Sequence, residues 1–557
     1  MMLKKVMALL LAVVMVFTLA TACGSKQDAQ GEKTQEDSQK AQEGNNTDNA
    51  GSGESTLPIT KDPLTLSCWT ALNANAAAVV KDYSEIEAMK VIKEKTGIDV
   101  KWMHPPVGQE KEQFNLMIST SDLPDVIEYN WPTDYSGGPQ KAIQDGVLIP
   151  LNDLIDQYAP NFKKILEENP EVKKQISTDN GDIYCFPYLY LDPKLEGPFQ
   201  GFQIREDWLK KLGLEMPSTI DDWYNVLTAF KKNDPNENGE SDEIPFGAQK
   251  TPEFYWFMTT WGMTPQYTGW YRVNNEIKFV YLQPEYEEYL RTMAKWYKEG
   301  LIDPDFAITD AKGFDSKVTT NKTGSYFGYP GSRLGRYMTL MEKENPDIKL
   351  AGVPYPVLKT GDKPIVGHKN NMFTGLGAGL TPANKHLAET VKWLDYRYGE
   401  EGHMLLEYGI EGKSYTMKDG EPVYTEEITK NPEGLAMALA MAKYCTGSFN
   451  VARVHDFESE KQQQARPEQV DALNAWFIES KDRNLPPLIL SPENSQEYSN
   501  IMNEVTTFVT ETETKVIMGA QPIESFDFEQ YRNTLKNMGI DQAIKTQQDA
   551  LDRYNKR

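Results

Sequence analysis

Residues 204–247, IREDWLKKLGLEMPSTIDDWYNVLTAFKKNDPNENGESDEIPFG, predict a helix, a turn, a second helix and an acidic loop. The first helix should end at Gly213, because glycine readily adopts the left-handed conformation of a helix C-cap. The second should begin at Thr219, since Asp222 lies at the spacing of a capping box. Its buried face is indicated by apolar side chains at helical spacing, namely Trp223, Val226, Leu227 and Phe230.

The acidic loop after this helix has the residue spacing of a calcium site. Oxygen-bearing side chains stand at loop positions 1, 3 and 5, and Gly239 at position 6 permits a sharp turn. The loop departs from a standard EF-hand, because Pro245 takes position 12, where a bidentate glutamate is usual. The alternative interpretation is a solvated acidic turn. The predicted calcium ligands are Asp234, Asn236, Asn238, Glu240 through its backbone carbonyl, Asp242 and Glu243.

Residues 204–247 resemble the signature of the large solute-binding lipoproteins of carbohydrate ABC importers. These form a subgroup of the maltose-binding type, extracellular solute-binding protein family 1, that includes alginate-binding proteins. LAGVPYPV at 350–357 with TGLGAGLTPANKHLAETVKWLDY at 374–396 is similar to the family's return crossover, and YGIEGKSY at 408–415 also resembles the subgroup. The resemblance covers most of the chain after residue 60.

The resemblance implies a fold, a cofactor and a partner. The fold is α/β and periplasmic-binding-protein-like, with two α/β lobes joined by a multi-crossover hinge and a helical C-terminal region. The cofactor is a structural Ca²⁺ in the acidic loop. The partners are the permease subunits of an ABC importer.

The N-terminus has the features of a bacterial lipoprotein. Residues 1–22 hold two lysines, an apolar run and then small residues, as in a secretion signal peptide. Cys23 follows directly in a pattern that resembles a lipobox, so its thiol should be lipidated; the alternative, a single-span helix anchor, has a rather short apolar run. Residues 23–60 are polar without aromatic rings and predict a flexible tether. We therefore expect a lipid-anchored protein on the extracytoplasmic face of the bacterial cell membrane.

The chain is strongly acidic, with 82 Asp and Glu against 58 Lys and Arg and a formal net charge of −24. Phosphate binding needs a basic face, so nucleic acid is not expected as a partner. Apart from Cys23, the remaining cysteines Cys68, Cys185 and Cys445 are odd in number and widely spaced, which argues against a disulfide framework. Buried thiols and one bridge both remain open, and we expect a monomer.

Alternating strands and helices predict the first lobe. Residues 64–69, 98–103 and 125–129 read as strands separated by helices, which is typical of a mostly parallel α/β sheet. Ligands of such sheets lie beyond the carboxyl ends of the strands. We expect the first lobe to comprise residues 61–195 and about 355–415, and the second lobe with the C-terminal helices to comprise residues 196–354 and about 416–557.

The sequence has no clear catalytic motif. Its five histidines are scattered, and it lacks a G-x-S-x-G elbow, a P-loop and a dinucleotide fingerprint after a strand. We therefore do not expect an enzyme, although the many carboxylates leave a glycosidase pair open.

Aromatic residues at strand and loop ends favour a carbohydrate site, because sugars offer apolar C–H faces to rings and hydroxyl groups to polar side chains. The resemblance implies that four segments line the cleft, with Tyr188 near the lobe junction. The candidates are Trp69 and Asn73 after the first strand, Tyr129, Trp131 and Asp134 after the third, Tyr255, Trp256 and Trp261 at an aromatic helix start, and Tyr326, Tyr329 and Arg333 around the GYPGSR turn.

Together these features predict a solute-binding lipoprotein that captures an oligosaccharide by lobe closure and delivers it to an ABC importer. Two alternatives from other classes are a secreted polysaccharide-degrading hydrolase or lyase and a surface glycan receptor. A peptide ligand also remains open, since aromatic clefts bind peptides too.

Overall fold

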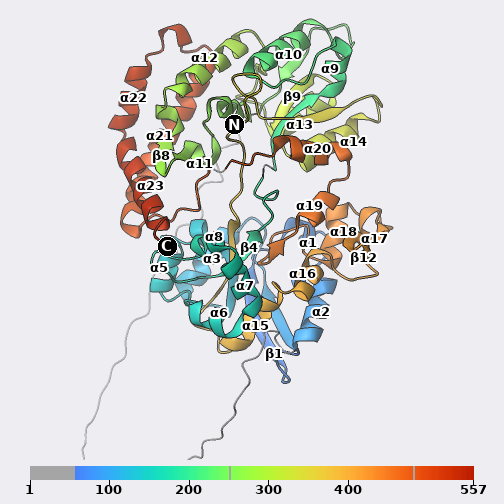
Figure 1. The fold of residues 1–557 in the computed structure, drawn as a ribbon, viewed down its shortest axis with the longest axis vertical. Helices are drawn as coiled ribbons and strands as arrows, with labels where there is room; N and C mark the ends of the chain where they lie inside the picture. Colours follow the sequence, from blue (N-terminus) through green and yellow to red (C-terminus); the bar gives the residue numbers. More distant parts are fainter. Residues whose placement is uncertain (1–56, 198, 250–252, 481–482) are drawn as a thin grey trace, which may run out of the picture. The chain divides into compact units, whose positions relative to one another are not determined.

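The computed structural model describes residues 57–197, 199–249, 253–480 and 483–557. The predicted signal peptide, Cys23 and the tether up to residue 56 lie outside the described residues. None of the described helices is long and apolar enough to cross a membrane. The strands form two main sheets, each with a hydrophobic core of its own, and a lobe is built around each sheet (Figure 1).

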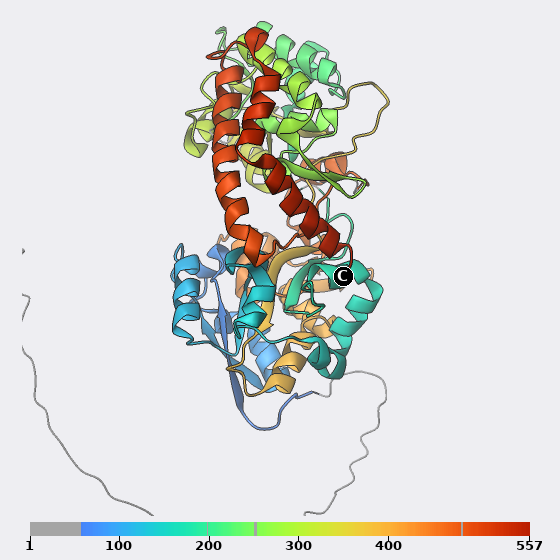
Figure 2. The ribbon, with the colours of Figure 1, turned by 90° about the vertical axis from the view of Figure 1, so that its left-hand side faces the viewer.

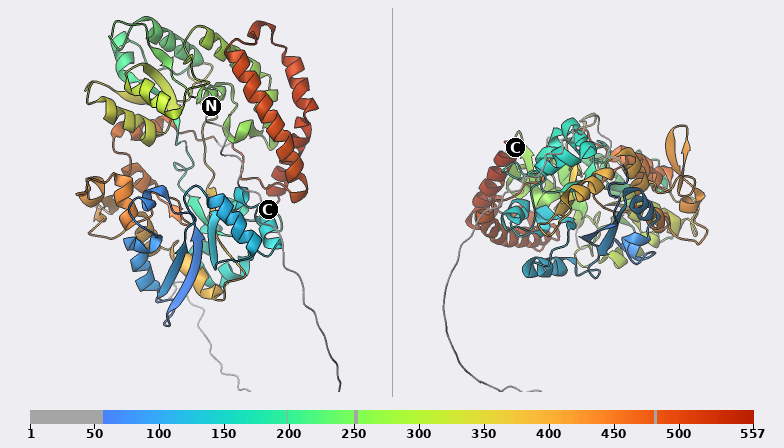
Figure 3. Two further views of the ribbon diagram at one scale, coloured as in Figure 1. Left: turned by 180° about the vertical axis from the view of Figure 1, so that it is seen from behind. Right: turned by 90° about the horizontal axis from the view of Figure 1, so that it is seen from below.

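The first lobe contains a six-stranded mixed sheet in the order β14-β4-β11-β3-β1-β2. Strand β1 pairs in parallel with both β2 and β3, and these strands are blue in Figure 3. Strand β11 returns from the second lobe and lies antiparallel between β3 and β4. The strands are β1 Leu64–Thr70, β2 Ile98–Met103, β3 Val126–Asn130, β4 Phe186–Tyr190, β11 Phe373–Leu380 and β14 Val454–His455.

Short helices surround this sheet, and a small hairpin is attached to the lobe. The helices are α1 Ala74–Ala77, α2 Glu87–Thr96, α3 Glu110–Thr120, α4 Trp131–Asp134, α5 Gly138–Gln144, α6 Asn152–Tyr158, α7 Pro160–Glu168, α8 Pro170–Gln175, α15 Leu387–Tyr396, α16 Glu400–Glu407, α17 Glu426–Thr429, α18 Met437–Tyr444 and α19 Phe457–Gln462, and the hairpin strands are β12 Tyr415–Lys418 and β13 Glu421–Tyr424.

The second lobe contains a four-stranded sheet in the order β10-β5-β9-β6 and a two-stranded hairpin, β7-β8. The long helix α21 and the last helix α23 contact each other along this lobe (Figure 2). The strands are β5 Gly201–Arg205, β6 Ile244–Phe246, β7 Trp270–Val273, β8 Glu276–Phe279, β9 Thr323–Gly328 and β10 Leu350–Val353. The helices are α9 Glu206–Leu212, α10 Ile220–Lys232, α11 Gln266–Gly269, α12 Glu285–Lys298, α13 Ala311–Thr319, α14 Arg336–Met341, α20 Pro467–Trp476, α21 Pro492–Ile517, α22 Phe528–Asn537 and α23 Ile540–Tyr554.

The predicted helix pair at residues 204–247 is confirmed as α9 and α10. Helix α9 ends at Gly213, which adopts the left-handed conformation with φ of 65°. At the start of α10, the Thr219 hydroxyl accepts from the Asp222 amide at 3.1 Å, and the Asp222 carboxylate accepts from the Thr219 amide at 2.9 Å. The predicted face is buried, so α10 anchors the core of the second lobe.

Three segments connect the lobes, at residues 191–200, 354–372 and 463–466. The last of these differs from the expected boundary near residue 416. Strand β14 pairs with β4 of the first sheet, and Phe449, Val451 and Ala452 lie in the first core. The chain therefore leaves the first lobe for the last time only after α19, whose Gln462 is bonded to β13, and α20 begins the final segment of the second lobe.

The C-terminus also contacts the first lobe directly. Arg553 and Arg557 both pair with Asp179, each at 2.7 Å. The Tyr554 hydroxyl donates to Glu171 at the start of α8. Helix α23 thus belongs to the second core, while its last turn is bonded to the first lobe.

Glu513 on α21 is a buried acid with no compensating charge. It is fully buried in the second core, and neither carboxyl oxygen makes a hydrogen bond. Its neighbours include Tyr286, Tyr289 and Tyr531. Burial raises the pKa of this carboxyl from 4.5 to about 8. Glu513 is therefore largely neutral in the folded state at neutral pH.

Replacing Glu513 with glutamine is expected to make the protein more resistant to alkaline pH. The folded state keeps a proton that the unfolded state releases above about pH 4.5, so the free energy of unfolding falls as the pH rises from 4.5 towards 8. We expect E513Q to remove roughly 3 kcal/mol of this decline. Urea unfolding between pH 5 and 9 measures how the free energy of unfolding depends on pH. Glu504→Gln, an exposed substitution on the same helix, is the control. Parallel pH profiles for E513Q and the unsubstituted protein would contradict the prediction.

Candidate functional site

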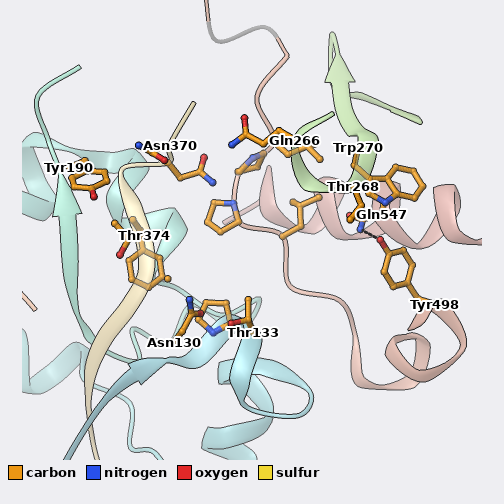
Figure 4. A pocket seen from close by; sticks show the side chains of 18 residues that line it. Asn130, Thr133, Tyr190, Gln266, Thr268, Trp270, Asn370, Thr374, Tyr498 and Gln547 are labelled. Carbon is orange, nitrogen blue, oxygen red and sulfur yellow. Dashed lines mark hydrogen bonds between the residues drawn. The ribbon is translucent and has the colours of Figure 1, made fainter. Parts of the chain in front are cut away.

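A pocket of about 580 Å³ is lined by both lobes and by the crossover that joins them (Figure 4). The crossover contributes Asn370 and Asn371. The first lobe contributes Asn130, Pro132, Thr133, Tyr190, Phe373, Thr374 and Gly375, and the second lobe contributes Gln266, Thr268, Trp270, residues 485–488, Tyr498 and Gln547.

The first-lobe wall is formed where three neighbouring strands meet the pocket. Asn130 ends β3, Tyr190 ends β4, and Thr374 lies at the start of β11 between them. Gly375 is needed here, because its φ is 98° and a Cβ would lie 2.6 Å from the Asn130 amide nitrogen. The glycine lets β11 pass the Asn130 side chain closely, so that the amide stays at the pocket.

The second-lobe wall combines aromatic rings with amides. The Trp270 ring lies between the rings of Phe279 and Tyr498, at centroid distances of 4.7 and 6.4 Å. The Tyr498 hydroxyl accepts a hydrogen bond of 2.6 Å from Gln547 of α23, drawn as a dashed line in Figure 4. These contacts hold an aromatic surface and a polar edge in fixed relation on this side of the pocket.

The Gln266 amide ties the second lobe to the crossover. It donates to the backbone carbonyl of Lys369 at 2.5 Å and accepts from the Lys369 backbone amide at 3.1 Å. Asn370, the next residue, donates from its backbone to the Glu196 carbonyl and from its side chain to the Leu195 carbonyl. The pocket floor is therefore built from bonds between different lobe-connecting segments.

A buried cluster of ionised groups lies behind Tyr190, whose ring is 5.8 Å from that of His455. His455 Nδ1 lies 2.9 Å from Glu407, and Arg453 Nε donates to Glu407 at 2.7 Å. Burial opposes charge on His455, but Glu407 and Glu460 outweigh it and raise the pKa to about 9. Burial opposes charge on Glu407 too, yet Arg453 and His455 lower its pKa to about 2. The ring of Tyr190 thus packs against His455, which belongs to this cluster of ionised side chains.

The six first-lobe residues predicted from the sequence lie near this wall without lining the pocket. Trp131 is fully buried and donates from Nε1 to the Gly377 carbonyl at 3.0 Å. Tyr188 is 2% exposed and covers Arg453, with the guanidinium 4.9 Å from its ring centre. Asn73 caps α1 by accepting from the Asn75 amide. Trp69 packs on Tyr129, and burial raises the pKa of Asp134.

The six second-lobe residues also lie outside the pocket lining. Tyr326 is fully buried in the core. Trp256 stacks on Phe327 at 4.9 Å and lies 5.7 Å from the ring of His368 on the crossover. Tyr255 and Trp261 pack against the second core, Tyr329 is 49% exposed and accepts a hydrogen bond from Gln200, and Arg333 pairs with Glu253 at 2.6 Å.

The prediction that Trp69, Trp131 and Trp256 share one opening is therefore not reproduced at this pocket. Trp131 and Tyr326 have no exposed surface with which to contact a ligand, because each ring fills the core beneath its strand end. The sequence located the carboxyl end of β3 correctly, but Asn130 lines the pocket where its two aromatic neighbours do not. Likewise, Tyr190 lines the pocket and the predicted Tyr188 does not.

Most of the second-lobe wall was missed from the sequence. Trp270, Tyr498 and Gln547 come from a hairpin and two helices far apart in the chain, so no local pattern joins them. The usable signals were the Asn370–Asn371 pair on the crossover and the Leu-Pro-Pro-Leu run at 485–488, a rigid apolar loop.

The predicted calcium loop forms a tight turn after α10. Asp234 and Glu237 adopt positive φ values of 44° and 58°. The Asp234 carboxylate accepts from the backbone amides of Asn238 and Gly239, at 3.2 and 3.0 Å. Asp242 accepts from the side-chain amide of Asn238 at 3.0 Å and pairs with Lys322 at 2.8 Å. The carboxylates of Asp234 and Asp242 are therefore held by N–H donors of the loop and by Lys322.

The environment of the Glu243 carboxyl group indicates whether the loop suits a cation. Its side chain is 6% exposed, and neither carboxyl oxygen has a hydrogen-bond partner. Burial and the negative charges of Asp234 and Asp242 raise its pKa. Among the described residues, no group of three or more His, Cys, Asp and Glu side chains is already arranged to hold a metal. The loop also offers two asparagine amides, and an unpaired buried carboxylate is a group that Ca²⁺ would satisfy.

The sequence model of the bacterial extracellular solute-binding protein family matches residues 76–404, more than half of the chain. The chain belongs to this family. The resemblance predicted from residues 204–247 is thereby confirmed, and so is the two-lobed α/β fold.

This solute-binding protein is similar in sequence to two curated bacterial proteins, FusA and LipO. It is 26% identical over 496 residues to the fructooligosaccharide ABC transporter substrate-binding protein FusA of Streptococcus pneumoniae serotype 4, covering 87% of this chain and 90% of FusA. It is 28% identical over 373 residues to lipoprotein LipO of Bacillus subtilis, covering 64% of this chain and 71% of LipO. FusA is named as a substrate-binding protein rather than as an enzyme, in agreement with the family.

Two solved structures share the fold over most of their length. Alginate-binding protein AlgQ2, crystallised without calcium ion, superimposes with a TM-score of 0.67 at 26% identity, covering 89% of this chain and 99% of AlgQ2. An EF-hand mutant of FusA in complex with fructo-nystose gives a TM-score of 0.67 at 25% identity, covering 88% of this chain and 99% of that structure.

Proposed function

We propose that this solute-binding protein captures an oligosaccharide in the pocket between its lobes and delivers it to the permease subunits of an ABC importer. The observation that carries the proposal is the lining of that pocket, which places aromatic rings and amide or hydroxyl side chains from both lobes around one space. Such a lining suits the apolar faces and hydroxyl edges of sugars. The similarity to FusA and AlgQ2, which are named for the saccharides they bind, supports it further.

The proposed mechanism is lobe closure rather than catalysis. A ligand that contacts Asn130 and Tyr190 on one wall and Tyr498 and Gln547 on the other gains all its contacts only when the walls approach each other. Its differential affinity therefore shifts the population towards the closed form, with the three connecting segments as hinges. The sequence-predicted residues with remaining exposure, Tyr129, Asp134, Trp256 and Tyr329 among them, would contact outer sugar units.

We further propose that the acidic loop binds a structural Ca²⁺. Asp234, Asp242 and Glu243 would supply carboxylate oxygens, Asn236 and Asn238 amide oxygens, and Glu240 its backbone carbonyl. Bound there, the ion would neutralise three neighbouring acids and fix the end of α10. The loop does not line the pocket, so its role would be to brace the second lobe.

The proposal includes a membrane anchor. Cys23 would carry lipid, and residues 24–60 would tether a monomeric binding protein at the extracytoplasmic face. The name of LipO supports this, since that relative is called a lipoprotein. Several acyl chains would be needed, because a single chain binds a membrane only reversibly.

Incubating the mature protein with oligosaccharides is expected to change its tryptophan fluorescence and to leave the sugars intact. Binding should be reversible, and mass spectrometry of the recovered ligand should show its original length. Shortened products would support the alternative of a secreted polysaccharide-degrading enzyme. Binding without any stimulation of transport by the cognate permease would instead favour a surface glycan receptor.

A further inference from the structure

We propose that the ligand of this pocket is a neutral saccharide rather than an acidic one such as a uronate oligomer. The inference rests on the proposed function, because it specifies the class of sugar that the same pocket accepts. Three features of the described residues carry it: the composition of the lining, the pairing of the nearby charges, and the hydrogen bonds already made by the lining amides.

Among the residues that the structure describes, the pocket lining contains no Asp, Glu, Lys, Arg or His. Its polar side chains are amides and hydroxyls, and its remaining surface is aromatic or aliphatic. One residue in four of the whole chain is charged, since Asp, Glu, Lys and Arg make up 25% of it, so an uncharged lining is a distinct local feature. A bound carboxylate would find no arginine or lysine for the bidentate or charge-assisted pairing that such groups use.

The charged cluster behind Tyr190 is compensated within the protein. Behind Tyr190, Arg453 and His455 face Glu407 and Glu460. The positive charges of Arg453 and His455 are therefore balanced by the negative charges of Glu407 and Glu460. This cluster leaves no net positive charge behind Tyr190 that would attract an anionic ligand.

The same holds behind the end of β3 and in the space next to the pocket. Beyond Asn130, Glu128 and Arg397 form a buried ion pair of 3.3 Å. An adjoining cavity of about 310 Å³ holds Lys174 and Arg272, but it also holds the acids Glu171 and Glu196. The overall charge of −24 adds a repulsive field for an anionic ligand.

The lining amides are also arranged for hydroxyl groups. Gln547 donates to Tyr498, Gln266 donates to the Lys369 carbonyl, and the side chain of Asn370 donates to the Leu195 carbonyl. These donors are engaged, whereas the buried Oδ1 of Asn130 has no hydrogen-bond partner. An amide oxygen accepts a hydrogen bond from a sugar hydroxyl, whereas it would face a carboxylate oxygen with like partial charge.

Isothermal titration of the mature protein with a matched pair of sugars tests the inference. The pair is α-1,4-galactotriose and trigalacturonic acid, which differ by oxidation at C6, alongside neutral trisaccharides of fructose, glucose, xylose and mannose and an acidic trimannuronate. We expect at least one neutral trisaccharide to bind at least 100-fold more tightly than either uronate. Its Kd should change less than twofold between 20 and 500 mM NaCl, because no ion pair is formed.

A charge-adding variant provides the second arm. Thr133 is an exposed lining residue of α4, and Thr133→Lys should raise the affinity for trigalacturonic acid at least tenfold at low salt, whereas Thr133→Gln should not. Tighter binding of either uronate than of every neutral sugar by the unsubstituted protein would overturn the inference while leaving the proposed function standing. Failure of all these saccharides to bind would overturn both.

Discussion

Removing calcium with a chelator is expected to lower the melting temperature of this solute-binding protein by about 4–7 °C, and added calcium should restore it. Ca²⁺ that binds only the folded loop contributes about 4 kcal/mol when its concentration is a thousand times Kd. The reason lies in Glu243, whose carboxyl oxygens are buried and unpaired beside Asp234 and Asp242. Without the cation, these acids repel one another. Thermal unfolding with EGTA and with excess CaCl₂ measures the effect.

Glu243→Gln separates calcium binding from general stability. The neutral amide removes both a ligand charge and the buried acid, so this variant should lose the response to calcium while melting at or above the calcium-free temperature of the unsubstituted protein. Glu237→Gln lies in the same loop, is exposed and is not among the predicted ligands, so it should respond normally. The proposal of a calcium site would be contradicted if E243Q still responded to calcium. It would also be contradicted if the melting temperature of the unsubstituted protein changed with neither EGTA nor calcium.

Truncating one amide on each wall of the pocket is expected to weaken saccharide binding about tenfold or more per substitution. Asn130→Ala acts on the first lobe and Gln547→Ala on the second. Each leaves a sugar hydroxyl without its partner in the pocket, and the second also removes the hydrogen bond to the Tyr498 hydroxyl. Titration of each variant with the best neutral trisaccharide measures the loss.

The matched control for Gln547 is Gln542→Ala on the same helix, because Gln542 is exposed and does not line the pocket. Its Kd should remain within twofold of the unsubstituted value. The melting temperatures of all three variants should stay close together, since none of these side chains fills a core. Full affinity in N130A and Q547A would place the ligand elsewhere on the protein.

Local signals allowed the sequence to predict much of the fold. The capping box at Thr219, the C-cap at Gly213 and the buried stripe of α10 depend on residues within one turn of each other, and all three are confirmed. The alternation of strands and helices identified the first sheet in the same way. The return of β14 to that sheet could not be seen, because two residues paired with β4 leave no periodic pattern.

The lining of the candidate pocket was harder to predict, because strand ends carry both core and surface residues. At the end of β3, Trp131 begins a helix and turns inward to the Gly377 carbonyl, and Asn130 is left at the pocket. Ring size therefore favoured Trp131, whereas Asn130 lines this pocket. Trp270, which does line the pocket, is the first residue of the β7-β8 hairpin, whose position depends on α21 and α23, far along the chain.

Hydrogen–deuterium exchange of the mature protein, measured with and without the best neutral trisaccharide, tests the central claim most directly. The account predicts that one ligand protects both walls together: residues 130–134 and 373–375 of the first lobe, and residues 266–270 and the peptide containing Gln547 of the second. Saccharide binding that protects only one lobe, or that leaves these segments unchanged, would contradict it.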